Sequence, residues 1–271
     1  GLFVTVQDTG GAFGTTPFDA HRAYLAGLPA LVKTASQEWP LARLEAIDLA
    51  CGQRDTATLA RALADELLLG GGEIEVGLPA DGARLSPRSV WTPVEPAQPV
   101  LTKDDVIVVS GGARGVTAAC VVELARDTQA RFVLLGRSEL TAEPACCAAA
   151  VTDADLKRAL LADALARGEK PKPAALGRQV RDILAAREIR ETLAQVEAVG
   201  GQVRYRAVSV TDSVGIDTVL TETRTEWGPI RALIHGAGVL ADRKIAELTD
   251  EEYDRVFDTK IEGLRVLLAA L

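Results

Sequence analysis

The segment 106–125, VIVVSGGARGVTAACVVELA, constrains the fold of this chain more than any other stretch. An apolar run typical of a buried parallel strand passes directly into Gly111, Gly112 and Gly115, and then into a helical pattern. Glycine weakens regular structure, so this cluster needs a local reason. A helix N-terminus that approaches a pyrophosphate supplies one. A tight turn without any ligand explains the glycines equally well at this point.

Composition narrows the class of protein. With 271 residues, 48% of them hydrophobic, the chain can bury the core of one large domain or two ordinary ones. A net charge of -8 argues against a nucleic-acid or anionic-membrane partner, since both require a basic face. No apolar run is long enough to span a membrane, and no signal peptide opens the sequence.

The 4 cysteines show no metal-ligand spacing, so no metal site is expected. Cys146 and Cys147 are adjacent and form a poor disulfide pair, which favours a reduced, cytoplasmic setting. The sequence has no methionine and ends within the helical pattern IEGLRVLLAAL without a capping signal. We therefore expect it to be a piece of a longer protein.

Residues 1–95 are predicted to form an α/β half-domain that begins in mid-fold. The patterns predict strands at 2–7, 44–50 and 73–78, helices at 21–39 and 58–70, and a hairpin-like segment at 79–91. The proline-rich stretch TPVEPAQPVLTKDD predicts a linker near residues 92–103. The chain is thus expected to divide into residues 1–95 and 96–271.

After the linker, strands and helices alternate. Strands are predicted at 106–110, 131–136, 202–210 and 232–238, and helices at 116–127, 213–227 and 249–271, with a helix-rich stretch at 153–199. Such alternation builds a parallel sheet with helices on both faces. The predicted fold class is therefore α/β, a doubly wound Rossmann-type sheet preceded by a truncated Rossmann-like subdomain.

The stretch 139–195 is longer than a strand-to-strand crossover requires. Its charged, alanine-rich sequence predicts a helical insertion that breaks at Pro171 and Pro173 before the crossover helix. Two interpretations remain open, a solvated helical decoration and a docking surface for neighbouring domains or a carrier.

The second predicted strand of this domain carries a cofactor signal. It ends in LLGRS, which places Arg137 and Ser138 where a binder of NAD usually has Asp or Glu for the ribose hydroxyl. A guanidinium and a hydroxyl instead suit a 2′-phosphate, so the sequence predicts NADPH. Arg114, inside the glycine turn, is a candidate second cation for that phosphate. Either arginine is also compatible with a solvated surface position.

The motifs SGGARGV, LLGRS and WGPIRALIHGAGVLADRKIAELTDEEYDRVFDTKIEGLRVL follow one another in this order. With them the chain resembles the ketoreductase domain of modular polyketide and polyunsaturated-fatty-acid synthases, within the short-chain dehydrogenase/reductase superfamily. Residues 1–95 resemble the later part of the cofactor-free structural subdomain of such domains, with GLPALVKTASQEWP matching a characteristic helix. Residues 100–271 resemble the cofactor-binding half of the catalytic subdomain.

The resemblance implies a set of cofactor-binding residues. The stretch 235–238 resembles the Asn/His-Ala-Ala-Gly turn of the family, in which His235 is expected to be structural rather than a proton donor. Ser209 and Val210 stand where relatives often have an aspartate for the adenine amino group. The complete predicted set is Gly111, Gly112, Ala113, Arg114, Gly115, Val116, Gly136, Arg137, Ser138, Ser209, Val210, His235, Gly236, Ala237 and Gly238.

Lys260 is the predicted catalytic residue. It resembles the family lysine that orders the proton relay and lowers the pKa of a catalytic tyrosine, although an exposed helix lysine is the alternative. The serine and the Tyr-x-x-x-Asn segment of the family are expected beyond Leu271. Tyr205 and Tyr253 lie in the wrong predicted elements to replace that tyrosine.

The resemblance implies an activity as well. The expected reaction is NADPH-dependent reduction of a β-ketoacyl thioester, carried on an acyl carrier protein, to the β-hydroxyacyl thioester. The expected partners are the carrier protein and neighbouring synthase domains. Two alternatives stay open, a non-catalytic Rossmann scaffold within a megasynthase and a stand-alone short-chain alcohol dehydrogenase. The cofactor-free half argues against the second.

Overall fold

A computed structural model describes residues 1–17, 19–94 and 100–271. Part of the predicted linker, residues 95–99, lies outside the described residues. The chain forms two compact units. Unit 1 comprises Gly1–Glu95 together with Arg243–Leu248, and unit 2 comprises Pro96–Asp242 and Thr249–Leu271. The sequence does not indicate that the short segment Arg243–Leu248 belongs to unit 1.

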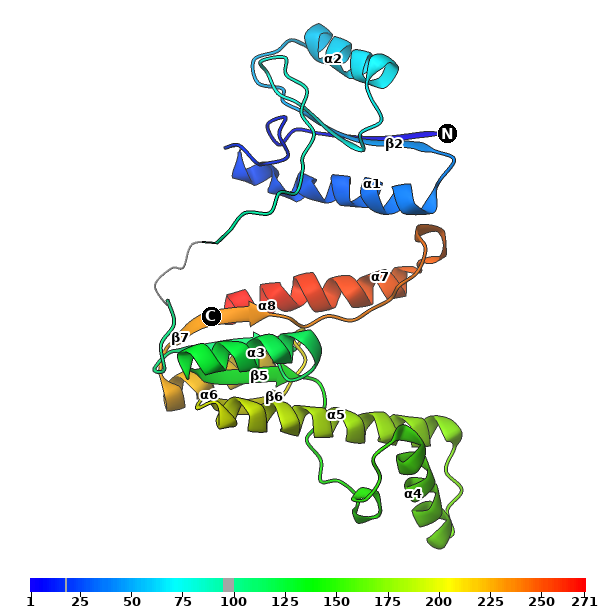
Figure 1. The fold of residues 1–271 in the computed structure, drawn as a ribbon, viewed down its shortest axis with the longest axis vertical. Helices are drawn as coiled ribbons and strands as arrows, with labels where there is room; N and C mark the ends of the chain where they lie inside the picture. The colour runs from blue at the N-terminus through cyan, green and yellow to red at the C-terminus, as the bar shows by residue number, and fades with distance from the viewer. Residues whose placement is uncertain (18, 95–99) are drawn as a thin grey trace. The chain divides into compact units, whose positions relative to one another are not determined.

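Unit 1 is a small parallel sheet with a helix on each side (Figure 1). Strands β1, β2 and β3 lie side by side in that order. Leu44 and Ala46 on β2 pack against Val32 and Ala35 of α1, while Glu45 between them meets Glu66 of α2. The elements are β1 (Leu2–Gln7), η1 (Ala20–Ala26), α1 (Gly27–Glu38), β2 (Arg43–Leu49), α2 (Thr56–Leu69), β3 (Glu75–Leu78) and η3 (Ile245–Glu247).

Two details of unit 1 depart from simple expectation. The hairpin predicted over 79–91 is reduced to one antiparallel bridge between Gly77 and Leu85 in the described residues. In the glycine-rich loop after β1, the amides of Thr9 and Phe13 donate hydrogen bonds of 2.6 and 2.7 Å to the buried carboxylate of Asp48. An internal carboxylate thus satisfies the backbone donors of this loop.

Unit 2 contains a four-stranded parallel sheet in the order β6-β5-β4-β7. The chain first builds outward from β4 through β5 to β6, and then returns to the other side of β4 with β7. Its elements are β4 (Val106–Ser110), α3 (Gly115–Thr128), β5 (Arg131–Gly136), η2 (Ala145–Cys147), α4 (Asp153–Ala166), α5 (Pro173–Ala198), β6 (Gln202–Ala207), α6 (Ser213–Trp227), β7 (Ile230–His235), α7 (Asp250–Phe257), the π-helical turn η4 (Asp258–Glu262) and α8 (Gly263–Ala270).

Helices cover both faces of this sheet. On one face, Ile107 and Phe132 pack against α3 and against Ile189 of α5. On the other face, Val108 and Leu135 pack against α6 and α8. Successive residues of a strand point to opposite faces, and here both sets are apolar, which explains the continuous hydrophobic runs of β4 and β5. The predicted α/β class with a doubly wound sheet is confirmed.

The predicted helical insertion forms α4 and the first part of α5, which extend away from the sheet (Figure 1). Pro173 occupies the first turn of α5, where its missing N–H costs nothing. The segment before α4 is fastened by Arg187, whose guanidinium binds the Glu143 carboxylate and the backbone carbonyls of Cys147 and Ala150. The buried side chains of this part include Cys147, Leu156, Leu160 and Val180.

The C-terminal helical pattern is not one continuous helix. The sequence predicts a helix over 249–271, whereas α7 passes into the π turn η4 before α8 begins. A π turn widens the helix by one residue, and such turns are frequent at functional sites. None of the helices in the described part of the chain has the length and apolar character needed to cross a bilayer.

Candidate functional site

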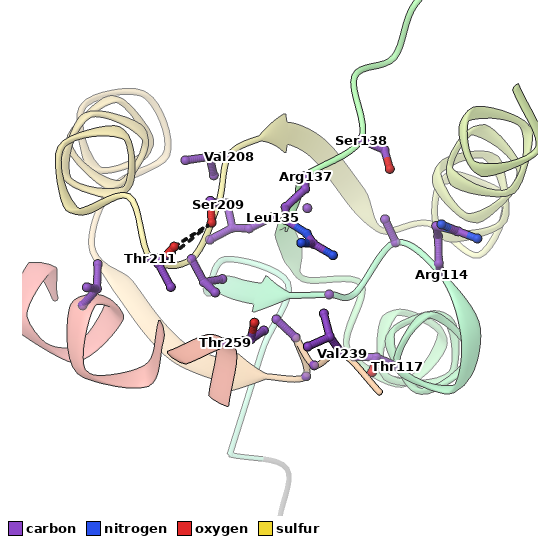
Figure 2. A pocket seen from close by; sticks show the side chains of 18 of the residues that line it. Arg114, Thr117, Leu135, Arg137, Ser138, Val208, Ser209, Thr211, Val239 and Thr259 are labelled. Carbon is purple, nitrogen blue, oxygen red and sulfur yellow. Dashed lines mark hydrogen bonds between the residues drawn. The ribbon is translucent and has the colours of Figure 1, made fainter. Parts of the chain in front are cut away.

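A cavity of about 740 Å³ lies in unit 2, at the ends of the strands where β4 separates β5 from β7 (Figure 2). In open parallel sheets, ligands bind outside the carboxyl ends of the strands at such a switch point. The predicted site residues that line it are Gly111, Ala113, Arg114, Gly136, Arg137, Ser138, Ser209, Val210, Gly236, Ala237 and Gly238. Gly112, Gly115, Val116, His235 and Lys260 do not line it, and the roles of all of these residues in binding stay predictions.

Two chain turns cross closely at the floor of the cavity. Gly111 has a left-handed backbone with φ +67°, and a Cβ at this position would lie 2.8 Å from the Cα of Ala237. A Cβ on Gly236 would lie 2.6 Å from the methyl carbon of Thr117. The Gly236 amide donates to the Ser110 carbonyl at 2.9 Å. These contacts require glycine at both turns and bring the N-terminus of α3 to the cavity.

The two arginines predicted to select the cofactor differ in their surroundings. Arg137 points into the cavity from the end of β5, and its exposed guanidinium has no hydrogen-bond or ion-pair partner among the described residues (Figure 2). Arg114 is turned away from the cavity centre toward α5, where its Nε donates to Glu188 at 2.7 Å (Figure 2). Of these two arginines, therefore, Arg137 alone presents an unpaired guanidinium to the cavity.

Tyr205 on β6 holds the loop that carries Arg137. Its phenol donates a 2.8 Å hydrogen bond to the backbone carbonyl of Ser138. A Cβ on Gly136 would lie 2.7 Å from the same phenol oxygen. Burial raises the pKa of Tyr205. The phenol therefore stays protonated near neutral pH and fixes the path of the chain at Ser138.

His235 joins β4, β7 and the π turn. Its Nε2 lies 3.0 Å from the backbone carbonyl of Lys260, which can only accept, so Nε2 carries the proton. Its Nδ1 lies 2.7 Å from the Ser110 hydroxyl. The oxygen of that hydroxyl accepts a hydrogen bond from the amide of Ala237 at 3.2 Å. In the neutral ring Nδ1 accepts the Ser110 proton, and every donor then has a partner. His235 thus links the ends of β4 and β7 to the π turn, and its structural role stays a prediction.

Lys260 lies in the π turn, with its side chain exposed. A Cβ on Gly238 would meet the Lys260 Cε at 3.0 Å and its Nζ at 3.4 Å. The absence of a side chain at Gly238 therefore leaves room for the lysine beside the 235–238 turn. The backbone carbonyl of Lys260 thus accepts a hydrogen bond from His235, and its side chain lies against Gly238.

The sequence did not predict every residue that lines the cavity. Thr117, Tyr205 and Thr211 line the cavity, and so does one side of the C-terminal helices. In a helix, residues three or four positions apart lie on one face. This spacing in the segment 249–271 is the sequence signal that could have identified the helix side facing the cavity. The residues on this side are Arg255, Asp258, Thr259, Glu262, Arg265 and Val266. Among the described residues no cluster of His, Cys, Asp or Glu has the arrangement of a metal site.

Comparison with known proteins identifies the family. The model of the KR domain matches residues 106–271, which form more than half of the chain and include the whole cavity. The chain belongs to the KR domain family. KR domains are ketoreductases of the short-chain dehydrogenase/reductase superfamily, an oxidoreductase family that binds a nicotinamide cofactor.

Two of the curated relatives of this KR domain are much longer proteins. One polypeptide of the polyunsaturated fatty acid synthase from Thraustochytrium sp. is 37% identical over 202 residues, which cover 72% of this chain and 7% of that protein. Erythronolide synthase EryA3 of Saccharopolyspora erythraea is 28% identical over 77% of this chain and 5% of its own length. The chain therefore spans less than a tenth of these relatives.

Solved ketoreductase structures share the fold over the full length of the KR chain. A ketoreductase domain from the bacillaene assembly line covers 99% of this chain with a TM-score of 0.64 and 20% identity, and 51% of that domain is matched. The ketoreductase of the first phoslactomycin module from Streptomyces sp. HK803 covers 100% with a TM-score of 0.63 and 24% identity, and 52% of it is matched. Both comparisons support the predicted Rossmann-type fold.

Proposed function

We propose that this KR domain binds NADPH and takes part in the reduction of a β-ketoacyl thioester, tethered to an acyl carrier protein, to the β-hydroxyacyl thioester. NADPH, when bound, supplies the hydride for the ketone carbon. The proposal rests mainly on the unpaired guanidinium of Arg137 at the end of β5.

The surroundings of Arg137 favour a 2′-phosphate over a free ribose hydroxyl. Arg137 is followed by Ser138, whose hydroxyl is also without a partner in the described part of the chain, and both line the cavity. A guanidinium can donate two parallel hydrogen bonds to a phosphate, and the neighbouring hydroxyl adds a third. A carboxylate, which would repel the phosphate, is not found at either position.

The remaining groups of the cavity suit a dinucleotide. The glycine turn at 111–115 lets the backbone come close to a pyrophosphate at the start of α3, and the 235–238 turn lies under the same cavity. Lys260 would act on the proton relay, held by His235 and Gly238. These assignments follow the family resemblance and are part of the proposal.

The substrate and the partners follow from the relatives. The chain matches small parts of synthases named for polyunsaturated fatty acids and erythronolide, so neighbouring synthase domains and a carrier-bound acyl thioester fit such a setting. A free-standing alcohol dehydrogenase has no need for unit 1, in which two cavities measure about 240 Å³ each, against about 740 Å³ for the cavity of unit 2.

Cofactor titration tests the proposal directly. The dissociation constants of NADPH and NADH are measured for the protein and for Arg137→Ala, with Arg178→Ala as a control that removes an exposed cation from α5. We expect a clear preference for NADPH, and a rise of about tenfold or more in its dissociation constant for Arg137→Ala alone. Equal affinity for both cofactors refutes NADPH selection. Failure to bind either one supports the scaffold alternative.

A further inference from the structure

Helix α5 contacts the glycine turn at 111–115 through Glu188 and Thr192, which lie one helical turn apart. The hydroxyl of Thr192 shares its proton between the backbone carbonyls of Ala113 and Glu188, each at 3.0 Å, and Thr192 and Ala113 are both buried. Glu188, four positions earlier, points along the same face of the helix. Three consecutive residues of the turn are therefore contacted from α5, because Glu188 binds both residues that follow Ala113.

The carboxylate of Glu188 is held by two donors. One oxygen accepts from the Arg114 Nε at 2.7 Å and the other from the Gly115 amide at 3.1 Å. Burial would raise the pKa of Glu188, but the hydrogen bonds from Arg114 and Gly115 outweigh it and lower the pKa. Glu188 is therefore an anion at neutral pH. It is bound to a backbone amide and to a guanidinium, which are also the groups that commonly bind a nucleotide phosphate.

The direction of Arg114 follows from this pairing. Its side chain is turned from the cavity centre toward α5, whereas Arg137 is turned into the cavity (Figure 2). A phosphate beside Arg137 would gain Arg114 only if the Arg114 side chain turned back from Glu188 toward the cavity. It would also meet the negative charge of Glu188 at short range, where salt screens only in part.

We propose that Glu188 masks Arg114, so that Arg137 alone supplies the cation for the 2′-phosphate and the preference for NADPH is weaker than the two arginines could give. This inference rests on the proposed function only in naming NADPH as the ligand. Glu188 is a positioning residue, since it acts through Arg114. Its loss should free Arg114 for the phosphate and strengthen NADPH binding.

The test compares two isosteric charge removals on α5. Glu188→Gln removes the masking charge, and Glu191→Gln removes the same charge from an exposed position farther along the helix. We expect Glu188→Gln to lower the dissociation constant of NADPH about three- to tenfold, with NADH changed less than about twofold. Glu191→Gln should leave both constants within about twofold of the unaltered protein.

A double-mutant cycle then asks whether the effect passes through Arg114. In an Arg114→Ala background, Glu188→Gln should give no gain in NADPH affinity, because no cation remains to be released. A gain that persists without Arg114 overturns the proposal, as does an equal gain from Glu191→Gln. Unchanged NADPH binding by Glu188→Gln also overturns the proposal. Weaker NADPH binding overturns it as well, and would show that Glu188 directs Arg114 toward the phosphate.

The outcomes separate this inference from the proposed function. If the unaltered protein prefers NADPH and Glu188→Gln changes nothing, the masking role fails and the proposed function stands. If the unaltered protein has no preference but Glu188→Gln gains one that depends on Arg114, the masking role stands and NADPH selection by Arg137 fails. If neither protein binds NADPH, both are refuted.

Discussion

Ser110 and His235 are joined by a 2.7 Å hydrogen bond between Oγ and Nδ1 that connects the ends of two adjacent strands. Its direction is fixed by the other partners of both residues. The Ala237 amide donates to Ser110, and His235 donates to the carbonyl of Lys260. One buried hydroxyl therefore links β4, the 235–238 turn and the π turn that carries the predicted catalytic lysine.

Replacement of Ser110 by alanine should destabilise unit 2. The substitution removes the hydroxyl with little change of volume and leaves the Ala237 amide and the His235 Nδ1 without their partner. A buried polar group without a hydrogen bond costs about 1–3 kcal/mol, so we expect a loss of this size in the free energy of unfolding, measured with urea. Ser138→Ala, whose hydroxyl has no partner among the described residues, is the control. Equal stability of the two variants would contradict the network.

A buried pair of carboxyl groups should make the stability of unit 1 depend on pH. Glu45 is 1% exposed and lies beside Glu66, which forms two hydrogen bonds with Arg84. Burial and the neighbouring Glu66 raise the pKa of Glu45, whereas Arg84 lowers that of Glu66. Of the two carboxyl groups, Glu45 therefore takes up a proton at the higher pH, even though Arg43 donates to it at 3.2 Å.

The sign of the effect follows from the raised pKa of Glu45. The folded state binds the proton more tightly than the unfolded state, whose value is near 4.5. This contribution to stability is complete below that pH and is lost as the pH rises through the folded-state pKa. Glu45→Gln should thus be more stable than the unaltered protein at neutral pH, with the difference shrinking on acidification. Urea unfolding between acidic and neutral pH measures it, and a pH-independent difference would disprove the assignment.

Arg187 should protect Cys147 from alkylation. Cys147 is buried, and burial together with the neighbouring Cys146 raises its pKa to about 11, so little thiolate is available at pH 8. Arg187→Ala removes the bonds that hold the carbonyls of Cys147 and Ala150. We expect faster iodoacetamide labelling of Cys147 in this variant, followed by mass spectrometry of the peptide.

The exposed Cys120 serves as an internal standard for the alkylation, since it lies on α3 and is not among the hydrogen-bond partners of Arg187 in the described part of the chain. Arg178→Ala is the matched variant, because Arg178 lies on α5 without a partner among the described residues. Equal labelling of Cys147 in the two arginine variants would show that Arg187 does not fasten this segment.

Many of the residues that line the cavity were among those predicted, because local signals in the sequence mark them. The run 106–110, the glycines after it and Arg137 at the end of the next strand are each recognisable within a few residues, and parallel strands place their carboxyl ends together. The fold class and the family could be predicted for the same reason, since strand and helix patterns alternate clearly over 106–271.

The features that the sequence did not predict depend on distant contacts. Glu188 lies 73 residues from Gly115, and nothing in the pattern of α5 indicates that it reaches the glycine turn. The π turn at Lys260 interrupts an unbroken helical pattern at a point where the His235 ring binds the backbone. Ile245 joins unit 1, where its amide donates to Glu38 at 2.7 Å, although the surrounding sequence belongs to unit 2.

Two glycines of one turn should respond differently to alanine. Gly111 and Gly115 both have left-handed backbones, with φ +67° and +62°. A Cβ on Gly115 meets no atom within 4 Å, whereas one on Gly111 would lie 2.8 Å from backbone atoms of Ala237. Gly115→Ala should therefore cost only the backbone strain of an L-residue, about 1–2 kcal/mol in the free energy of unfolding.

Gly111→Ala adds a steric clash with a backbone that is itself fixed by Ser110. Overpacking of this kind costs about 1–3 kcal/mol beyond the strain, so Gly111→Ala should be the less stable variant by that amount. It should also weaken binding of NADPH and NADH alike, because it separates the two turns that form the floor of the cavity. Urea unfolding and cofactor titration of both variants check this, and equal losses for the two alanines would mean that the turns do not meet as described.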